Sequence, residues 1–397
     1  MTDPASAESS VADRAFITDA HTTRDRATRY AYLAMFAYVW GLYGMGPALL
    51  IIRHETGMSR TVASLHSTAT AIGFLIIGTF GPRITARLGR IRTVRLGTAG
   101  IGIGIALVAF GGTAMISIPG AMCIGLGGSM ALNGLNAFLA MHHGSRGAAI
   151  IGEGAGVSML AGLLSPLAIG AFIDWGIDWR FAMALAVVAL VVADRTRGDD
   201  RVFDVGYRTP STEHGALPAS YWWAWTAAAL CIGVEFSFVM WAGDVLRSQS
   251  DASTSLAAAS LTAVAAGMAT GRFLIGPMLR RMRLETLFRA SLTLPLVAWF
   301  PMWFGSSSVL ILLAMVTIGV GLGFHYPLSL SRMVAASGGH ADLANARSSL
   351  ASGIAIAIAP LALGALADAL GLHAAFVAVP TMLAAALLIA VTRPVTP

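Results

Sequence analysis

Glu235 lies near the middle of a long apolar run, within the segment Cys231-Ile-Gly-Val-Glu-Phe-Ser-Phe-Val-Met-Trp241. An ionised carboxylate is costly in such surroundings, so Glu235 is a candidate for binding a cation or for taking up and releasing a proton. No basic residue lies within one helical turn of it along the chain. The alternative is a carboxyl group that only holds two helices together.

Four other ionisable residues also lie inside apolar runs, each nearer to one end of its run: Glu153, Arg272, His325 and Arg347. Charged and titratable side chains at membrane depth mark substrate pathways, proton relays or buried pairs. Each of the four is therefore either a functional group or one member of a structural pair.

Polar uncharged and aromatic residues extend the candidate set. Asn133 and Asn136 are three residues apart, so they share one helix face and point toward a cavity or toward the next helix. Tyr326 stands beside Pro327 and could line a cavity. Four aromatic residues at helical spacing form a stripe that is either a packing surface or a binding wall: Tyr32, Phe36, Trp40 and Tyr43. The set predicted for proton coupling and substrate binding is Glu235, His325, Asn133, Asn136, Trp40, Tyr43 and Tyr326.

No catalytic or metal site is predicted. The sequence has no phosphate-binding loop, no nucleophile elbow around a serine and no Cys/His set with metal-ligand spacing. Cys123 and Cys231 both lie inside apolar runs and are predicted to be unpaired buried thiols. His142 and His143 follow an apolar run and are predicted to lie at a membrane interface. Neither an enzyme nor an ATP-driven pump is therefore indicated.

The composition is that of a protein with many membrane-spanning helices. The chain is 56% hydrophobic and only 12% charged, whereas soluble domains contain about 25% charged residues. The net charge of +6 comes from arginine alone, because the sequence has no lysine. The arginines lie in loops between apolar runs rather than on one basic face, which argues against nucleic-acid binding.

Twelve apolar runs are long enough to cross a bilayer, which takes about 20 residues. They lie at 30–52, 61–82, 93–112, 115–140, 147–173, 179–194, 220–245, 254–279, 286–304, 308–331, 342–368 and 373–392. The sixth run is the shortest. The fold class predicted is an all-α membrane protein of twelve transmembrane helices in two pseudo-symmetric six-helix bundles.

The distribution of arginine supports that count and orients the chain. With the N-terminus in the cytoplasm, most of the 26 arginines fall in cytoplasmic segments, as the positive-inside rule requires. Both termini are then cytoplasmic. The sequence predicts a disordered segment over 1–28, a first six-helix bundle over 29–194, a cytoplasmic linker over 195–219 and a second six-helix bundle over 220–393.

An internal repeat supports the division into two halves. The segment Pro166-Leu-Ala-Ile-Gly-Ala-Phe-Ile-Asp174 returns as Pro360-Leu-Ala-Leu-Gly-Ala-Leu-Ala-Asp368, identical at six of nine positions and shifted by 194 residues. An offset near half the chain length indicates two copies of one unit. Asp174 and Asp368 are therefore predicted to occupy equivalent ends of the fifth and eleventh helices.

The sequence resembles the major facilitator superfamily over residues 29–393. The loop Pro82-Arg-Ile-Thr-Ala-Arg-Leu-Gly-Arg-Ile-Arg-Thr93 is similar to the family's basic loop, with Gly89 and Arg90 in place but Ala86 where the family has Asp. The segment Gly162-Leu-Leu-Ser-Pro166-Leu-Ala-Ile-Gly170 resembles the antiporter motif of the fifth helix, with Ser165 replacing a glycine. Pro360 and Gly364 repeat Pro166 and Gly170 in the second half.

The resemblance implies two bundles that rock about a central cavity and expose it to either side in turn. It also implies that the fifth helix packs against the eighth, and the second against the eleventh. Glu153 and Arg272 are then expected to approach each other as a cytoplasmic gate, and Arg83 or Arg87 to meet Asp342. Arg347, at similar depth, joins these gate candidates.

We interpret the sequence as a secondary active transporter of a small organic molecule. The predicted mode of transport is proton-coupled efflux, so the protein would be an antiporter. A proton-coupled importer of a small organic acid is the first alternative, with Arg272 or Arg347 as the partner of the anion. A non-transporting receptor or scaffold is the second. The protein is expected in the inner or plasma membrane as a monomer, with a lipid bilayer and a small-molecule substrate as its partners. An ion gradient, rather than a cofactor, is expected to drive it.

Overall fold

The computed structural model describes residues 24–143, 147–203, 217–338 and 341–395, and these residues form helices and connections without any strand. The first half of the chain contains α2 (Arg26–Thr56), α3 (Arg60–Leu88), α4 (Arg90–Phe110), α5 (Ala114–His142), α6 (Gly147–Asp174), α7 (Trp179–Thr196) and the short η2 (Asp200–Phe203). The second half contains α8 (Ala219–Gln249), α9 (Thr254–Ala259), α10 (Leu261–Leu279), α11 (Leu284–Phe304), α12 (Ser308–Ala335), α13 (Ala341–Leu370), α14 (Leu372–Ala375) and α15 (Ala378–Thr392).

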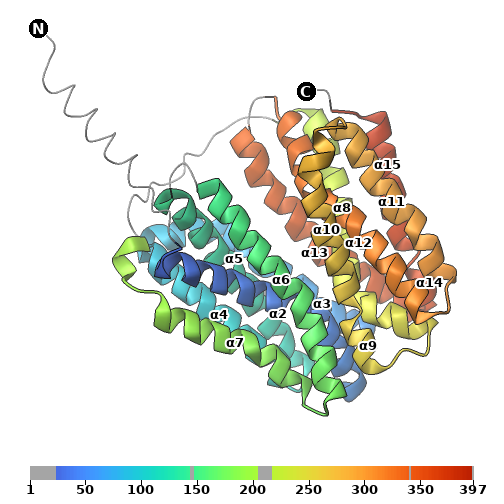
Figure 1. Cartoon of the computed structure of the whole chain (residues 1–397), viewed down its shortest axis with the longest axis horizontal. Coiled ribbons are helices and arrows are strands. Elements are labelled where there is room, and N and C mark those ends of the chain that lie inside the picture. Colours follow the sequence, from blue (N-terminus) through green and yellow to red (C-terminus); the bar gives the residue numbers. More distant parts are fainter. Residues whose placement is uncertain (1–23, 144–146, 204–216, 339–340, 396–397) are drawn as a thin grey trace, which may run out of the picture.

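The helices form two bundles, drawn in blue to green and in yellow to red in Figure 1. Consecutive long helices run in opposite directions, so the start of α2, η2 and the end of α15 all lie at one end of the molecule. We call this the linker end, and we call the other end, which carries α9 and α14, the far end. The predicted arrangement of two helical bundles is confirmed.

Eleven segments of the described residues are long and apolar enough to cross a membrane. The twelfth predicted crossing corresponds to α7, which is not among these eleven; it is only 18 residues long and carries Asp194 and Arg195 in its last turn. Its apolar face, which includes the buried Trp179 and Met183, packs against α2 and α4. A short helix of this kind is held by its neighbours within the bundle rather than by its own hydropathy.

The first helix begins earlier than predicted. The side chain of Asp25 caps it by accepting a hydrogen bond from the backbone N–H of Thr28 at 2.8 Å. Thr28 is itself buried and bonds through its hydroxyl to His143 Nε2 at 2.8 Å. Residues 24–28 thus belong to α2 and its cap rather than to the predicted disordered segment, and residues 1–23 lie outside the described part of the chain.

Candidate functional site

A buried hydrogen bond joins the two halves near the middle of the molecule. Tyr43 of α2 donates its hydroxyl hydrogen to Glu235 Oε1 of α8 across 3.2 Å. Tyr43 is 5% exposed and Glu235 is 8% exposed. Because each residue belongs to a different half, any movement of one half against the other must lengthen, break or remake this bond. Glu235 therefore lies at a direct contact between the two halves.

Arg272 of α10 and Tyr326 of α12 complete this central cluster. The guanidinium of Arg272 interacts electrostatically with Glu235, Tyr43 and Tyr326. It forms no ion pair with a described residue, and its Nη1 lies 2.5 Å from the sulfur of Met159 on α6. Tyr326 is 42% exposed. A carboxyl group, a cation and a phenol that is open to the surroundings therefore lie together where the two halves meet.

Two other predicted binding residues form hydrogen bonds within their own half instead. Trp40 donates its indole N–H to the carbonyl of Ala182 on α7 at 3.0 Å. His325 is 1% exposed, and its Nε2 lies 3.1 Å from the carbonyl of Ser291 on α11. Both side chains serve packing in this state, because neither reaches the central cluster. Within the aromatic stripe only Tyr43 bonds to a residue of the second half, whereas Tyr32 bonds to the carbonyl of Ile150.

Asn133 and Asn136 lie on α5 and form no hydrogen bond with a described residue. Asn133 is exposed, whereas Asn136 is half-buried and its Oδ1 is enclosed without a partner among the described residues. An enclosed amide oxygen is costly unless water or a ligand bonds to it. Asn136 therefore remains a candidate for contact with a ligand or with an ordered water molecule.

At the far end the two halves are tightly closed. Arg53 of α2 forms an ion pair with Asp244 of α8, and the two side chains are only 13% and 8% exposed. The guanidinium of Arg53 also lies over the ring of Trp241, 5.7 Å from its centroid. A Cβ atom added at Gly46 of α2 would overlap the carbonyl of Val239 on α8. Backbone approaches this close are possible only where one helix lacks a side chain.

A second contact at the far end caps a helix across the interface. Asp368, at the end of α13, accepts hydrogen bonds from the backbone N–H groups of Arg60 and Thr61 at 3.0 and 2.7 Å. The hydroxyl of Thr61 adds a third bond at 2.6 Å. A carboxylate is favoured at a helix N-terminus, where N–H groups lack intrahelical partners. Asp174, the equivalent residue of the first half, is exposed and forms no such bond with a described residue.

At the linker end the gate residues are not joined across the interface. Glu153 of α6 pairs with Arg24 of its own half, with Nη2 to Oε2 at 2.6 Å. A Cβ atom added at Gly78 of α3, Gly156 of α6 or Gly276 of α10 would meet no atom within 4 Å. None of these three glycines therefore makes a close contact of the kind that Gly46 makes at the far end.

The remaining gate candidates agree with an open linker end. Arg83 and Arg87 of α3 are exposed and form no ion pair with a described residue. Arg347 of α13 is exposed, and its carbonyl accepts a bond from the Trp225 indole at 3.1 Å. The side chain of Asp342 lies outside the described part of the structure. The predicted pairing of Glu153 with Arg272 belongs to a state that is closed at this end and stays a prediction.

The two recognised motifs have different structural tasks. Gly89 joins α3 to α4 with φ of 82°, a conformation that favours glycine. Arg90, 3% exposed, donates to the carbonyl of Phe203 in η2 at 2.9 Å and so fastens the linker to the first half. The repeated Pro-Gly segments, by contrast, lie in the interface between the halves. Gly170 faces the backbone of α9, and Gly364 faces that of α3.

Three further motif positions are enclosed within their own half. Gly162 faces the ring of Tyr43, so its missing side chain makes room for the phenol that bonds to Glu235. Pro166 and Pro360 are buried within α6 and α13, and the carbonyl of Pro360 accepts a bond from the Trp241 indole at 3.4 Å.

The ion pair at the far end was not predicted from the sequence. Arg53 directly follows the first predicted span, 30–52, and Asp244 lies at the end of the seventh, 220–245. A signal was present, because the two positions are 191 residues apart, close to the repeat offset. They therefore occupy nearly equivalent ends of the first helix of each half, and such ends lie side by side when two copies of a bundle face each other.

The fold and this interface define a class of membrane transporter, and the comparisons with known proteins agree. The profile of the Major Facilitator Superfamily matches residues 31–337, so the chain belongs to this superfamily. It is a transporter rather than an enzyme. A bacterial homologue of the human lysosomal transporter Spinster, in an inward-facing and occupied conformation, is similar with a TM-score of 0.73 at 15% identity over 94% of this chain and 97% of that one.

The same homologue in an inward-facing and unoccupied conformation has a TM-score of 0.62 at 14% identity, over 92% of this chain and 95% of that one. The fucose:proton symporter of E. coli has a TM-score of 0.58 at 14% identity, over 94% of this chain and 100% of that one. A comparison with curated proteins found no match. At these identities the likeness concerns the fold, and the substrate has to be argued from the site.

Proposed function

We propose that the protein is a proton-coupled secondary transporter of a small organic molecule, with Glu235 as the residue that carries the coupling proton. The observation that carries the proposal is the buried bond from Tyr43 to Glu235, because it joins a titratable group in one half to a phenol in the other. The driving force is an ion gradient, and no cofactor takes part.

The coupling follows from a difference between states. In the structure Glu235 is enclosed, and enclosure disfavours the ionised form of a carboxyl group. When the halves move and water or a cationic substrate reaches the group, ionisation becomes cheaper and the proton leaves. Only a group whose affinity for the proton differs between the two states can couple proton movement to the change of state.

We further propose export of a partly apolar molecule as the direction of transport. The small residues of the antiporter-like segment, with Gly162 against Tyr43 and Gly170 against α9, support this direction. Import of a small organic acid is a second candidate, and Arg272 favours it. This cation is half-buried in the central cluster and forms no ion pair with a described residue, so a substrate carboxylate could bind its guanidinium directly.

The test combines ligand identification with flux. A thermal-unfolding screen of metabolites and antibiotics identifies compounds that bind the folded protein and raise its stability. Proteoliposomes with an internal pH dye then report whether such a compound drives proton movement. Glu235→Gln keeps the shape of the side chain but cannot release a proton, so gradient-driven accumulation should be lost while counterflow exchange persists. Normal accumulation with unchanged pH dependence in Glu235→Gln would contradict the coupling role.

Tyr43→Phe is the matched control for that experiment. It removes the hydroxyl that bonds to Glu235 but leaves the carboxyl group able to titrate. Coupled accumulation should therefore persist with an altered pH dependence. The direction of transport follows from the sign of the response to an imposed pH gradient, and binding without counterflow would identify a receptor.

We also propose that Glu153 and Arg272 pair when the linker end closes. Glu153 would then exchange its present partner, Arg24, for a cation of the other half. Reversal of either charge alone should impair transport, and reversal of both should restore part of the loss. A double variant no better than the worse single variant would rule the pair out.

The orientation proposed for the membrane places the linker end in the cytoplasm. The arginines of the α3–α4 and α10–α11 connections support it. In a background without Cys123 and Cys231, a cysteine at position 201 should resist an impermeant maleimide in intact cells and react in inverted vesicles. Labelling in intact cells would reverse the proposed topology.

A further inference from the structure

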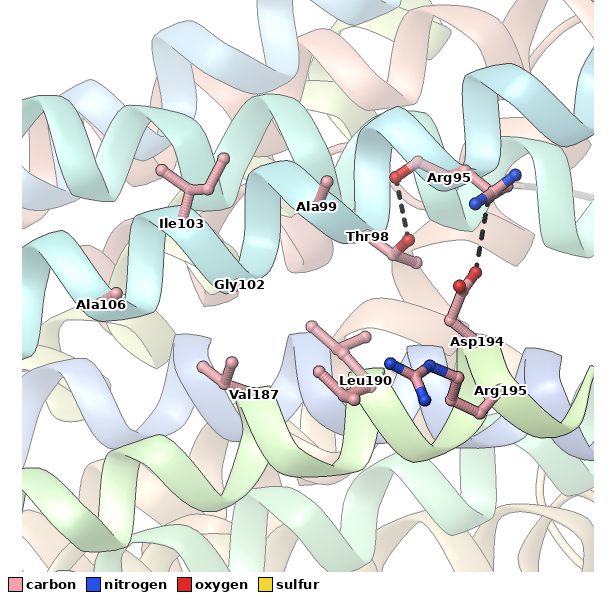
Figure 2. A pocket seen from close by; sticks show the side chains of 11 residues that line it. Arg95, Thr98, Ala99, Gly102, Ile103, Ala106, Val187, Leu190, Asp194 and Arg195 are labelled. Atoms are coloured by element: carbon pink, nitrogen blue, oxygen red, sulfur yellow. Dashed lines mark hydrogen bonds and ion pairs between the residues drawn. The ribbon is translucent and has the colours of Figure 1, made fainter.

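A groove of about 590 Å³ runs along the outside of the first half, between α4 and α7 (Figure 2). Small and apolar residues line most of its length, among them Gly102, Ile103 and Leu190. Its charged residues all lie at one end, which is the linker end: Arg95 on α4, and Asp194 and Arg195 on α7. The groove does not include Tyr43, Glu235 or any other residue of the central cluster.

The missing side chain of Gly102 keeps the middle of the groove empty. A Cβ atom placed there would meet only Leu190 Cδ1 at 3.7 Å and Val187 Cγ1 at 4.0 Å, both ordinary contact distances. Nearby apolar side chains are turned outward, with Ile103 57% and Val191 52% exposed. In a membrane protein such surfaces face the hydrocarbon of the bilayer. The groove therefore opens toward lipid.

The ion pairs at the linker end of the groove leave one arginine without a partner among the described residues. Arg95 lies 3.4 Å from Asp194 and 3.9 Å from Asp200. Arg197 pairs with the same two carboxylates, and its hydrogen bond holds the pKa of Asp200 below the usual range, so that Asp200 stays charged. Arg195 is exposed and forms no ion pair with a described residue. Of the three arginines, Arg195 is thus the one outside these ion pairs, and it can bind an external anion.

The length of the groove matches one leaflet of a bilayer. From Arg95 to Ala106 the stripe on α4 runs for about 16 Å, at 1.5 Å per residue. The hydrocarbon core of a bilayer is about 30 Å thick, so the chains of one leaflet reach about half of that depth. A ligand with a negative head at the surface and an apolar tail of that reach fits both the charge and the length.

We propose that this groove binds a phospholipid with an anionic headgroup, from the leaflet at the linker end. Its phosphate lies between Arg195 and Arg95, and one acyl chain follows Gly102 and Leu190 toward Ala106. The second half offers a natural comparison. A groove of about 300 Å³ between α11 and α12, lined by residues such as Leu294, Pro301 and Leu313, contains no charged residue. It should show no preference for anionic lipid.

The test uses the full-length protein in phosphatidylcholine vesicles that contain phosphatidylglycerol with a photoreactive acyl chain. Crosslinks, located by mass spectrometry of peptides, should be concentrated in 95–106 and 187–195. The same probe on a phosphatidylcholine headgroup should label these segments much less. Equal labelling by the two lipids would show ordinary lipid contact and overturn the proposal.

Two variants test the two parts of the site separately. Gly102→Leu fills the groove, so crosslinking in both segments should fall, whereas Ala290→Leu adds bulk on the exposed face of α11 and should not change it. Arg195→Gln leaves the groove open and removes the cation outside the ion pairs, which should lower the preference for phosphatidylglycerol about fivefold. Arg281→Gln, which removes the charge of an exposed arginine outside the groove, is the control for Arg195→Gln. An unchanged preference in Arg195→Gln would overturn the proposal even if Gly102→Leu folded poorly.

Discussion

The far end and the linker end of the interface between the two halves differ in how closely their helices approach one another. At the far end α2 and α8 touch backbone to backbone at Gly46, and a buried ion pair joins Arg53 to Asp244. At the linker end Gly78 and Gly156 face open space. The two halves are therefore in close contact at the far end, and these two glycines at the linker end make no such contact.

The two ends also differ in how their charges are paired. The pair of Arg53 with Asp244 crosses between the halves and is buried, whereas the pair of Glu153 with Arg24 stays within one half and is partly exposed. A buried pair is expensive to break, because the remaining charge loses its partner without regaining water. An exposed pair contributes little. The ion pair at the far end thus holds the two halves together, whereas the ion pair at the linker end does not join them.

The largest effect is expected from Asp244→Asn, which leaves Arg53 buried without a counter-charge. Loss of one partner of such a pair costs about 3–5 kcal/mol, and this cost falls on the state that is closed at the far end. The protein should shift to a state open at that end. Pulsed electron resonance between spin labels at Thr56 and Asp251, both exposed residues at the far end, should report a longer distance.

Glu153→Gln is the matched control for Asp244→Asn. It removes one partner of the exposed pair with Arg24, so the distance between the same two labels should stay as in the parent protein. Equal shifts in the two variants would show that the ends do not differ in the way the structure indicates.

A smaller effect is expected from Gly46→Ala, tested against Gly156→Ala. The added methyl group at Gly46 meets the carbonyl of Val239, so α2 and α8 must separate. Overpacking of this kind costs about 1–3 kcal/mol. The same methyl group at Gly156 meets no atom in this state. Gly46→Ala should therefore lengthen the distance between the far-end labels, and Gly156→Ala should leave it unchanged.

Gly156→Ala also tests whether the ends alternate. If α6 packs closely against the other half when the linker end closes, the added methyl group should hinder that state. Labels at Ala86 and Leu279, exposed at the linker end, should then show fewer molecules with a short distance during transport. If Gly46→Ala and Gly156→Ala both lengthen the far-end distance, the far end and the linker end do not close in turn.

The sequence predicted the architecture because hydropathy and arginine placement act over whole segments. Apolar runs of about 20 residues can satisfy their backbone groups only as helices in a bilayer, so the two-bundle fold followed. The sequence also singled out Glu235 and Tyr43, since a carboxyl group and a phenol in apolar runs stand out. It gave no indication that they bond to each other, because helix rotation within a bundle depends on packing against several neighbours.

Other predicted residues show where sequence reasoning stops. Like Tyr43, His325 and Trp40 are side chains with polar atoms inside apolar runs. In the structure, however, their polar atoms bond to carbonyls of neighbouring helices in their own half. Nothing in a single amino-acid sequence distinguishes a helix face that packs within its own bundle from one that packs against the other bundle. The partner of Glu153 could not be predicted either, because Arg24 lay in a segment assigned to the disordered N-terminus.

The smallest effect is expected at the two repeated aspartates. Asp368→Ala removes three hydrogen bonds to the start of α3, and loss of a helix cap costs about 0.5–2 kcal/mol. Asp174→Ala removes the equivalent carboxylate of the first half, which is exposed and bonds to no described residue there, so it should cost almost nothing in this state. Thermal unfolding of the purified variants should show a lower Tm for Asp368→Ala only.

The far-end labels at Thr56 and Asp251 add a second measurement to that comparison. Asp368 bonds across the interface, so its loss should also lengthen their distance slightly, whereas a purely local cap would leave the distance alone. Thr61→Ala, which removes one of the three bonds, should fall between the parent and Asp368→Ala in both measurements. If Asp174→Ala and Asp368→Ala have the same Tm and the same far-end distance, the hydrogen bonds of Asp368 do not stabilise the interface. The far end is then held by the ion pair and the close backbone packing alone.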